Sequence, residues 1–303
     1  MVGRGAATAL VWAAVVAVAT VVSRAQQLQV GFYDTLCPAA EIIVQEEGCD
    51  ASVLLDSSAG NQAEKDAAPN ASLRGFEVID SAKTRLEQAC FGVVSCADVL
   101  AFAARDALAL VGGDAYQVPA GRRDGNVSSA QEAGANLPPP TASASQLTQA
   151  FGAKGLSQAE MVALSGAHTV GAARCSSFAP RLYSYGPSGA GQDPSMDPAY
   201  LAALAQQCPP QGTGAADPPL PMDPVTPTAF DTNYYANLVA RRGLLASDQA
   251  LLADPATAAQ VLAYTNSPAT FQTDFVAAMI KMGAIQVLTG TAGTVRTNCR
   301  VAS

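Results

Sequence analysis

The chain is short of histidine, and this scarcity limits the chemistry that it can perform. His168 is the only histidine among 303 residues. A histidine-rich metal site, a pair of imidazoles acting as acid and base, and the zinc motif HExxH all need more than one. The sequence also lacks the G-x-S-x-G elbow of hydrolases, a Walker phosphate loop and a G-x-G-x-x-G turn. Any reaction that needs an imidazole must therefore use His168.

Basic residues are also few. Lys and Arg total 17 against 25 Asp and Glu, which gives a formal net charge of −8. This balance excludes a nucleic-acid binder that is steered by positive charge. Hydrophobic residues make up 49% of the chain, which excludes a disordered protein and is enough for a large buried core.

The N-terminus has the pattern of a secretory signal peptide. Arg4 precedes an apolar run at residues 6–22, and Ser23 and Ala25 are small residues at the −3 and −1 positions of a cleavage site. The alternative is a membrane anchor, but the run is too short and too rich in alanine for a stable transmembrane span. We expect residues 1–25 to be a signal peptide and residues 26–303 to be a secreted domain with no membrane segment.

Export favours disulfides over metal ligation for the cysteines. There are seven, so one is left unpaired: Cys37, Cys49, Cys90, Cys96, Cys175, Cys208 and Cys299. Secretion also gives weight to two N-glycosylation sequons, which begin at Asn70 and Asn126. Both asparagines are expected on the surface.

The apolar spacing predicts a mainly helical chain. Residues 76–86 and 96–111 repeat at helical spacing, and Ser95 and Ser157 begin sequences of capping-box form. Near the end, Ser267 and Pro268 are expected to start a helix that Gly283 stops. Its apolar stripe, expected to be core, consists of Phe271, Phe275, Ala278, Met279 and Met282. Residues 116–118 are the best candidate for a short strand, and residues 121–141 and 209–227 are expected to be functional loops.

His168 follows the helix expected after Ser157, with Gly166, Ala167 and Gly171 beside it. A lone histidine is more often a satisfied core or surface residue than a ligand. The small neighbours, however, would let a flat macrocycle approach the backbone beneath an imidazole, so we predict a haem iron held by His168. An acidic residue should orient the other ring nitrogen, but spacing alone does not say which one. A serine hydrolase is the alternative that the missing elbow argues against.

Ten short motifs in order along the chain complete a pattern that resembles the secreted plant peroxidases, class III of the haem peroxidase superfamily. They are FYDxxCP from Phe32, GCDASVLL from Gly48, EKD from Glu64, RGF from Arg74, VSCAD from Val94, GRRD from Gly121, NLP from Asn136, SGAHTVG from Ser165, FDxxYY from Phe230 and SDQ from Ser247. The resemblance implies a mainly α fold in which two helical halves sandwich haem b.

The resemblance also implies roles for individual residues. His168 would be the axial haem ligand, Asp248 its hydrogen-bond partner, and Pro138 a contact for phenolic donors at the haem edge. Calcium would bind at two places. The proximal site would use Thr169, Asp223, Thr226 and Asp231, and the distal site would keep Gly48, Asp50, Ser52 and Glu64. The implied disulfides are Cys37–Cys90, Cys96–Cys299 and Cys175–Cys208.

The chain departs from the family between Glu47 and Gly48. About two dozen residues of the family pattern are missing there, including an arginine and a second, catalytic histidine. No catalytic residue of the distal pocket remains, and Cys49 loses its partner. Because peroxide cleavage needs a base and a charge-stabilising donor, we expect strongly impaired activity.

The sequence thus predicts, by its resemblance to this family, a haem peroxidase that uses hydrogen peroxide to oxidise small phenolic donors. It would be an extracellular or cell-wall monomer with no nucleic-acid partner. The alternative is a non-enzymatic haem-binding or misfolded secreted glycoprotein from an aberrant gene model or splice form.

Overall fold

The computed structural model describes residues 28–40, 51–186, 188–210 and 217–302. The expected signal peptide at 1–25 lies outside these residues. The described chain is mostly helical, as predicted. Its α-helices are α3 (Phe76–Ala89), α4 (Cys96–Leu110), α5 (Ala130–Asn136), α6 (Ala144–Ala153), α7 (Gln158–Ser165), α8 (Ala179–Tyr183), α9 (Pro198–Gln207), α10 (Asn233–Val239), α11 (Ala246–Ala250), α12 (Pro255–Asn266) and α13 (Pro268–Met282). The 3-10 helices are η1 (Ser52–Leu54), η2 (Glu64–Asp66), η3 (Ala68–Asn70), η4 (Gly166–Thr169) and η5 (Cys175–Ser177).

Local capping chemistry sets several helix starts where the sequence predicted them. The Ser157 hydroxyl accepts from the Glu160 amide, and the Glu160 carboxylate accepts from the Ser157 amide, which completes a capping box for α7. Ser95 caps α4 by accepting from the Asp98 amide. Ser267 precedes α13 with Pro268 in its first turn, and Gly283 follows its last residue. Phe271, Phe275 and Ala278 of the α13 stripe are buried, whereas Met282 is 40% exposed, so the stripe ends before that residue.

The expected strand at residues 116–118 is wrong. These residues have no ladder partner, and the neighbouring Ala120 makes a single bridge to Gln29. The strands of the described residues are short pairs instead. β1 (Arg122–Arg123) pairs with β4 (Leu288–Thr289), and β2 (Ala172–Arg174) pairs with β3 (Pro219–Pro221), both antiparallel. The stretches expected to be loops hold β1, α5 and β3 instead. The two strands could not be seen in the local sequence because their partners, β4 and β2, come from distant segments.

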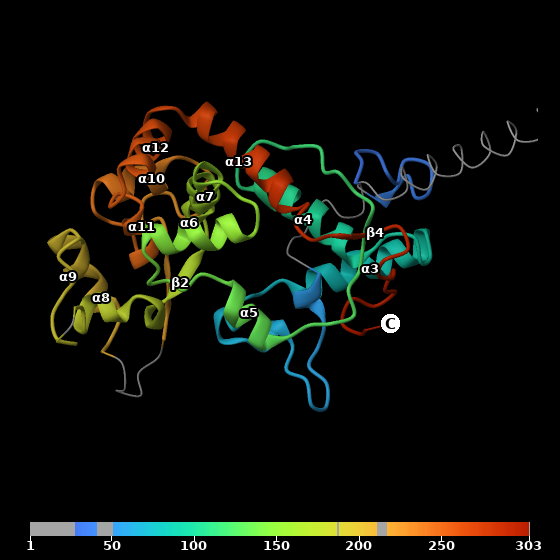
Figure 1. Ribbon diagram of the computed structural model, residues 1–303, viewed down its shortest axis with the longest axis horizontal. Coiled ribbons are helices and arrows are strands. Elements are labelled where there is room, and N and C mark those ends of the chain that lie inside the picture. The colour runs from blue at the N-terminus through green and yellow to red at the C-terminus, as the bar shows by residue number, and fades with distance from the viewer. Residues whose placement is uncertain (1–27, 41–50, 187, 211–216, 303) are drawn as a thin grey trace, which may run out of the picture.

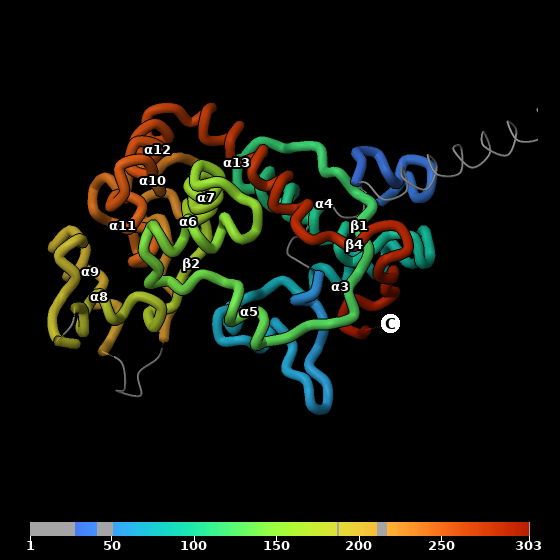
Figure 2. The backbone as a smooth tube through the Cα atoms, viewed as in Figure 1, coloured from blue at the N-terminus to red at the C-terminus, as the bar shows by residue number. Residues whose placement is uncertain are grey.

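The helices divide between two ends of the molecule (Figure 1). One end holds α3, α4 and the C-terminal residues around a buried cluster that includes Ile79, Phe102 and Cys299, here called the N-terminal core. The other end holds α6 to α12. Its helices α6, α7, α10 and α12, together with α13, surround a cluster that includes Met161, Tyr235 and Phe271, here called the central core. The helices α8 and α9 pack around a separate small cluster that includes Leu182 and Leu201. The tube in Figure 2 shows α13 running from α12 toward β4, so it extends between the two ends.

Three disulfides tie the chain together. They join Cys37 to Cys90, Cys96 to Cys299 and Cys175 to Cys208, with sequence separations of 53, 203 and 33 residues. These are the pairs that the resemblance implied. Cys49 lies outside the described residues. No helix in the described part of the chain is long and apolar enough to span a membrane.

Candidate active site

His168 lies in η4, directly after α7. Its Nδ1 is 2.8 Å from Oδ1 of Asp248, 80 residues further along the chain. An ionised carboxylate can only accept a hydrogen bond, so the proton belongs on Nδ1. Nε2 is then left with a lone pair, which is the state in which an imidazole binds a metal.

Asp248 is fixed in place from several sides. It lies in α11 with 3% of its side chain exposed, and its second oxygen accepts from the Leu245 amide at 2.9 Å. The Tyr234 hydroxyl donates to Oδ1 at 3.1 Å. Burial lowers the pKa of His168, but the charge and hydrogen bond of Asp248 raise it by more, so the net shift is upward. Asp248 therefore both orients the imidazole and makes it a stronger electron donor.

One side of the His168 ring is open, and the surrounding chain allows a flat group to approach it. The side chain is 39% exposed although Thr169 beside it is fully buried. Gly171 has a φ of +90°, and a Cβ added there would meet nothing within 4 Å. A planar macrocycle that covers the imidazole fits this open surface and the free Nε2.

Gly166 corrects one part of the sequence argument. A Cβ at Gly166 would lie 2.4 Å from the Phe271 ring and from the Tyr235 hydroxyl. This glycine is therefore required by packing against the central core, and it does not make room for a cofactor. Of the other small neighbours of His168, Gly171 is exposed and Ala167 is half buried.

The four residues expected at the proximal calcium site come together next to His168. The Thr169 hydroxyl lies 3.4 Å from Asp223 Oδ2 and 3.2 Å from Asp231 Oδ1. The Thr226 hydroxyl lies 3.0 Å from Asp223 Oδ2 and 2.8 Å from Asp231 Oδ2. Two carboxylates and two hydroxyls around one point form the hard-oxygen donor set that calcium prefers. Asp223 is fully buried, and a nearby cation would stabilise it.

The described residues hold no group of three or more His, Cys, Asp or Glu side chains that could bind a metal. The proximal cluster agrees with this, because two of its four residues are threonines. Any ion there would depend on hydroxyl and backbone oxygens as well as on the carboxylates.

Only part of the expected distal site can be described. The Ser52 hydroxyl donates to Glu64 Oε2 at 3.0 Å, so these two expected calcium residues are in contact. The Asn70 side-chain amide donates to the Glu64 carbonyl at 2.8 Å. Gly48 and Asp50 lie outside the described residues, as does the junction between Glu47 and Gly48. The resemblance places the missing histidine and arginine at that junction.

Two further predicted positions lie near the surface. Pro138 is half buried in the turn between α5 and α6, and its contact with donors stays a prediction. Asn126 is exposed and Asn70 is half buried. Exposure suits Asn126 better than Asn70 as a glycan acceptor.

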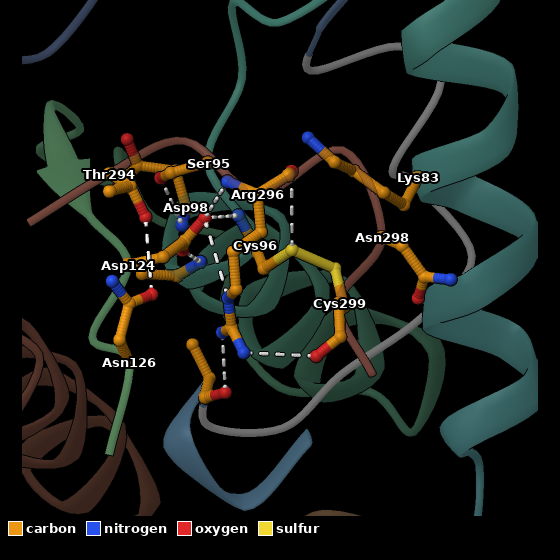
Figure 3. A network of polar contacts seen from close by, with 12 residues as sticks. Lys83, Ser95, Cys96, Asp98, Asp124, Asn126, Thr294, Arg296, Asn298 and Cys299 are labelled. Carbon is orange, nitrogen blue, oxygen red and sulfur yellow. Dashed lines mark hydrogen bonds and ion pairs between the residues drawn. A yellow bond between two sulfur atoms is a disulfide. The ribbon is translucent and has the colours of Figure 1, made fainter. Parts of the chain in front are cut away.

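Sequence reasoning missed a second group of buried charges, which joins distant motifs in the N-terminal core (Figure 3). Asp98 is fully buried and accepts from the Tyr33 hydroxyl, the Gly121 and Arg122 amides and the Arg122 guanidinium at 2.7 to 3.0 Å. The capping-box pattern at Ser95 predicts that the Asp98 carboxylate turns back to the start of its own helix. The carboxylate faces the GRRD motif instead, so this part of the prediction is wrong. The motif spacing gave no signal for this pairing.

Asp124, the last residue of GRRD, makes the matching connection to the C-terminal segment. It accepts from the Cys96, Ala97 and Arg296 amides at 2.8 to 3.1 Å. The buried Arg296 in turn donates to the Cys299 carbonyl (Figure 3). It also donates to the Ala51 carbonyl. VSCAD and GRRD therefore hold the N-terminal core together through Asp98 and Asp124.

Comparison with known proteins agrees with this geometry. Residues 8–267 match the peroxidase family. The chain belongs to this family. Its plant relatives include Peroxidase 5 of Vitis vinifera, 52% identical over 302 residues that cover 91% of each chain. Peroxidase 1 of Zea mays is 47% identical over 305 residues, which cover 91% of this chain and 83% of the relative. Peroxidase 28 of Arabidopsis thaliana is 42% identical over 301 residues, covering 90% and 92%.

Membership confirms the recognition as a plant peroxidase and the mainly helical fold class. As a member of the peroxidase family, the protein is an oxidoreductase. Haem is the cofactor that this family uses.

Proposed function

We propose that His168 binds the iron of haem b through Nε2 and that this peroxidase uses hydrogen peroxide to oxidise small phenolic donors outside the cell. The observation that carries the proposal is the His168–Asp248 hydrogen bond of 2.8 Å beside the open face at Gly171. Bound there, haem supplies the one-electron redox chemistry that peroxide drives. Asp248 keeps the proton on Nδ1 and the imidazole in a fixed orientation.

Calcium would hold the chain around His168 in place. Thr169 follows His168 directly, and its hydroxyl belongs to the cluster with Asp223, Thr226 and Asp231. A cation in this cluster would fix the end of η4, and with it the direction of the imidazole. The distal ion is proposed only as a remnant at Ser52 and Glu64, with Gly48 and Asp50 as the remaining donors.

The chain is also proposed to react with peroxide slowly, because the distal histidine and arginine are absent. The alignment with the grapevine relative supports a gap. It spans 302 positions but uses 91% of the 303 residues here, or about 276, so about 26 positions of the relative have no counterpart. A base is worth roughly 10² to 10⁴ in rate and a charge-stabilising donor roughly 10² to 10³. Their loss would leave water as the proton carrier.

Removal of His168 tests the haem assignment. Haem-loaded His168→Gly should lose the Soret absorption of the ligated ferric state, and added imidazole should restore it by occupying the vacated space. Far-UV circular dichroism and the three disulfides serve as controls for folding. An unchanged Soret band in His168→Gly without imidazole would contradict the proposal.

Restoration of the gap tests the impairment. The segment that the grapevine relative carries at this place is inserted between Glu47 and Gly48, and both haem-loaded chains are mixed with stoichiometric peroxide in a stopped-flow instrument. The insertion should accelerate the first step by about 10² or more. Equal, fast rates in both chains would show that another residue serves as the distal base.

The alternative function, a non-enzymatic haem-binding glycoprotein, is favoured by the same missing residues. It predicts haem binding without turnover of phenolic donors, even with excess peroxide. Sequencing of the transcript across the codons for Glu47 and Gly48 distinguishes a real shortened protein from an aberrant gene model.

A further inference from the structure

A row of three tyrosine rings leads from His168 into the central core. The Tyr234 and His168 rings meet edge to face, with centroids 6.0 Å apart. The Tyr234 and Tyr235 centroids are 5.0 Å apart, and those of Tyr235 and Tyr264 are 5.1 Å apart. The row runs from η4 through α10 to α12, which pack against each other (Figure 1). Each ring is therefore in contact with the next.

The two ends of the row have carboxylates as hydrogen-bond partners. The Tyr234 hydroxyl donates to Asp248 at 3.1 Å, and the Tyr264 hydroxyl donates to Asp274 Oδ2 at 2.9 Å. The middle hydroxyl, that of Tyr235, donates to the Val162 carbonyl at 2.9 Å. A carboxylate can take up a proton at neutral pH and a backbone carbonyl cannot. Only the two end tyrosines can therefore lose a proton when they lose an electron.

Packing alone does not explain tyrosine at these positions. All three are at most 2% exposed, and they lie among Phe271 and Phe275, which fill the same core without a polar group. A buried hydroxyl gains little net stability from its hydrogen bond and costs free energy if that bond is lost. Burial raises the pKa of the Tyr264 phenol, so this phenol keeps its proton until it gives up an electron, and the hydrogen bond to Asp274 then provides the place for the proton.

Asp274 distinguishes the far end from the end beside His168. Asp274 is exposed on α13, so a proton that reaches it can pass to solvent. Asp248 is buried and already accepts from His168 and Leu245. A proton delivered to Asp248 would disturb the bond that orients the imidazole. An oxidised tyrosine is therefore better accommodated at Tyr264 than at Tyr234.

We propose that Tyr234, Tyr235 and Tyr264 form an electron-transfer path. An electron from Tyr264 would reduce an oxidising equivalent left at the haem, and Tyr264 would hold the resulting radical. The inference rests on the proposed haem site at His168. The electron leaves the Tyr264 phenol, passes through the Tyr235 and Tyr234 rings, and reduces the equivalent that the peroxide produced. The phenol proton goes to the Asp274 carboxylate. The path protects a poorly shielded haem whenever no phenolic donor is present.

Tyr33 provides an internal control. Its hydroxyl also donates to a buried carboxylate, Asp98, at 2.8 Å. Its ring, however, packs against Phe32 and Phe102 in the N-terminal core. Tyr33 thus has a carboxylate partner, as Tyr264 has, but that carboxylate is buried and no row of rings leads from Tyr33 to His168.

The test uses the full haem-loaded chain and peracetic acid, a peroxide whose carboxylate leaving group needs little proton assistance. The chain is oxidised with a nitroso spin trap present, the radical is observed by electron paramagnetic resonance, and the trapped residue is located by peptide mass spectrometry. The adduct is expected on Tyr264 and not on Tyr33. Tyr264→Phe should remove it, and Asp274→Asn should lower its yield by about tenfold or more. Tyr235→Phe keeps the ring and should retain the adduct.

The outcomes separate this inference from the haem proposal. Haem that binds through His168 and is oxidised without a Tyr264 adduct would overturn the path alone. Equal adducts on Tyr264 and Tyr33 would also overturn it, because they would show unselective oxidation. A chain that binds no haem would overturn both proposals, and the Soret band shows this before any oxidant is added.

Discussion

Asp98 in the N-terminal core and Asp248 beside the central core are both buried carboxylates, but they face different partners. Asp98 meets the Arg122 guanidinium, two amides and a hydroxyl, so its charge is balanced within the protein. Asp248 meets one amide, one phenol and the imidazole of His168, which is 39% exposed. A carboxylate with a full set of fixed partners holds a fold together. One whose main partner can still bind a ligand is available for function.

The disulfides offer the strongest way to test how far the two regions differ in stability. Cys96→Ala with Cys299→Ala opens a link across 203 residues in the N-terminal core, and Cys175→Ala with Cys208→Ala opens one across 33 residues. The longer loop should cost about 5 kcal/mol and the shorter about 4 kcal/mol, because more chain entropy is released. Urea unfolding under oxidising conditions measures both. A larger loss for the shorter loop would reverse the ranking.

Substitution of the two aspartates separates stability from cofactor binding. Asp98→Asn leaves Arg122 buried without its counter-charge, so the free energy of unfolding should fall by about 3 to 5 kcal/mol. Asp248→Asn should mainly weaken haem retention, because Nδ1 of His168 loses a charged acceptor. Urea unfolding and Soret titration are measured on both variants. Similar profiles for the two would mean that the regions do not differ in role.

Chelation of calcium should act mainly on the region around His168, because the proposed distal site is only a remnant. Asp223→Asn removes one of the two carboxylates of the proximal cluster, and chelator treatment of the unchanged chain should have a similar effect. Free calcium at 100 times its dissociation constant adds about 2.7 kcal/mol to the free energy of unfolding. The midpoint of thermal unfolding should fall in both cases, and chelator should lower it little further in Asp223→Asn.

Asp197→Asn serves as the matched control for calcium. Asp197 caps α9 through the Tyr200 amide, and asparagine caps equally well. This variant should keep the full response to chelator. A chelator response that is lost in Asp197→Asn as well would argue against the assigned cluster.

The smallest expected effect concerns the surface ion pair of Glu160 and Lys281. The Lys281 hydrogen bond and the Ser157 amide hold the pKa of Glu160 below its usual value. Stability from this pair is therefore present above the ordinary Glu pKa and is lost as the pH falls through the lowered value. Glu160→Gln keeps a capping acceptor for Ser157 but should remove this part of the pH dependence, at less than about 1 kcal/mol. Urea unfolding between neutral and acidic pH measures it.

Features that depend on neighbouring residues were predicted from the sequence. Ser157, Ser95 and Gly283 mark helix ends because caps act over a few residues. Features that depend on distant partners were not. Residues 116–118 alternate as a strand should but find no partner, and Gly166 is small because Phe271 approaches it. Spacing alone also did not select Asp248 among the acidic residues, and only the family pattern pointed to it.

The sequence by itself determined that one imidazole is available, that most of the chain is helical and that the motifs of a peroxidase stand in order. These follow from residue counts and local periodicity, which need no knowledge of the fold. The tertiary structure decided which groups meet. It joins His168 to Asp248 across 80 residues, Asp98 to GRRD, and three tyrosines into one row. The physical reason is that buried polar groups must find partners wherever the chain brings them, and contacts between distant segments leave no mark in local spacing.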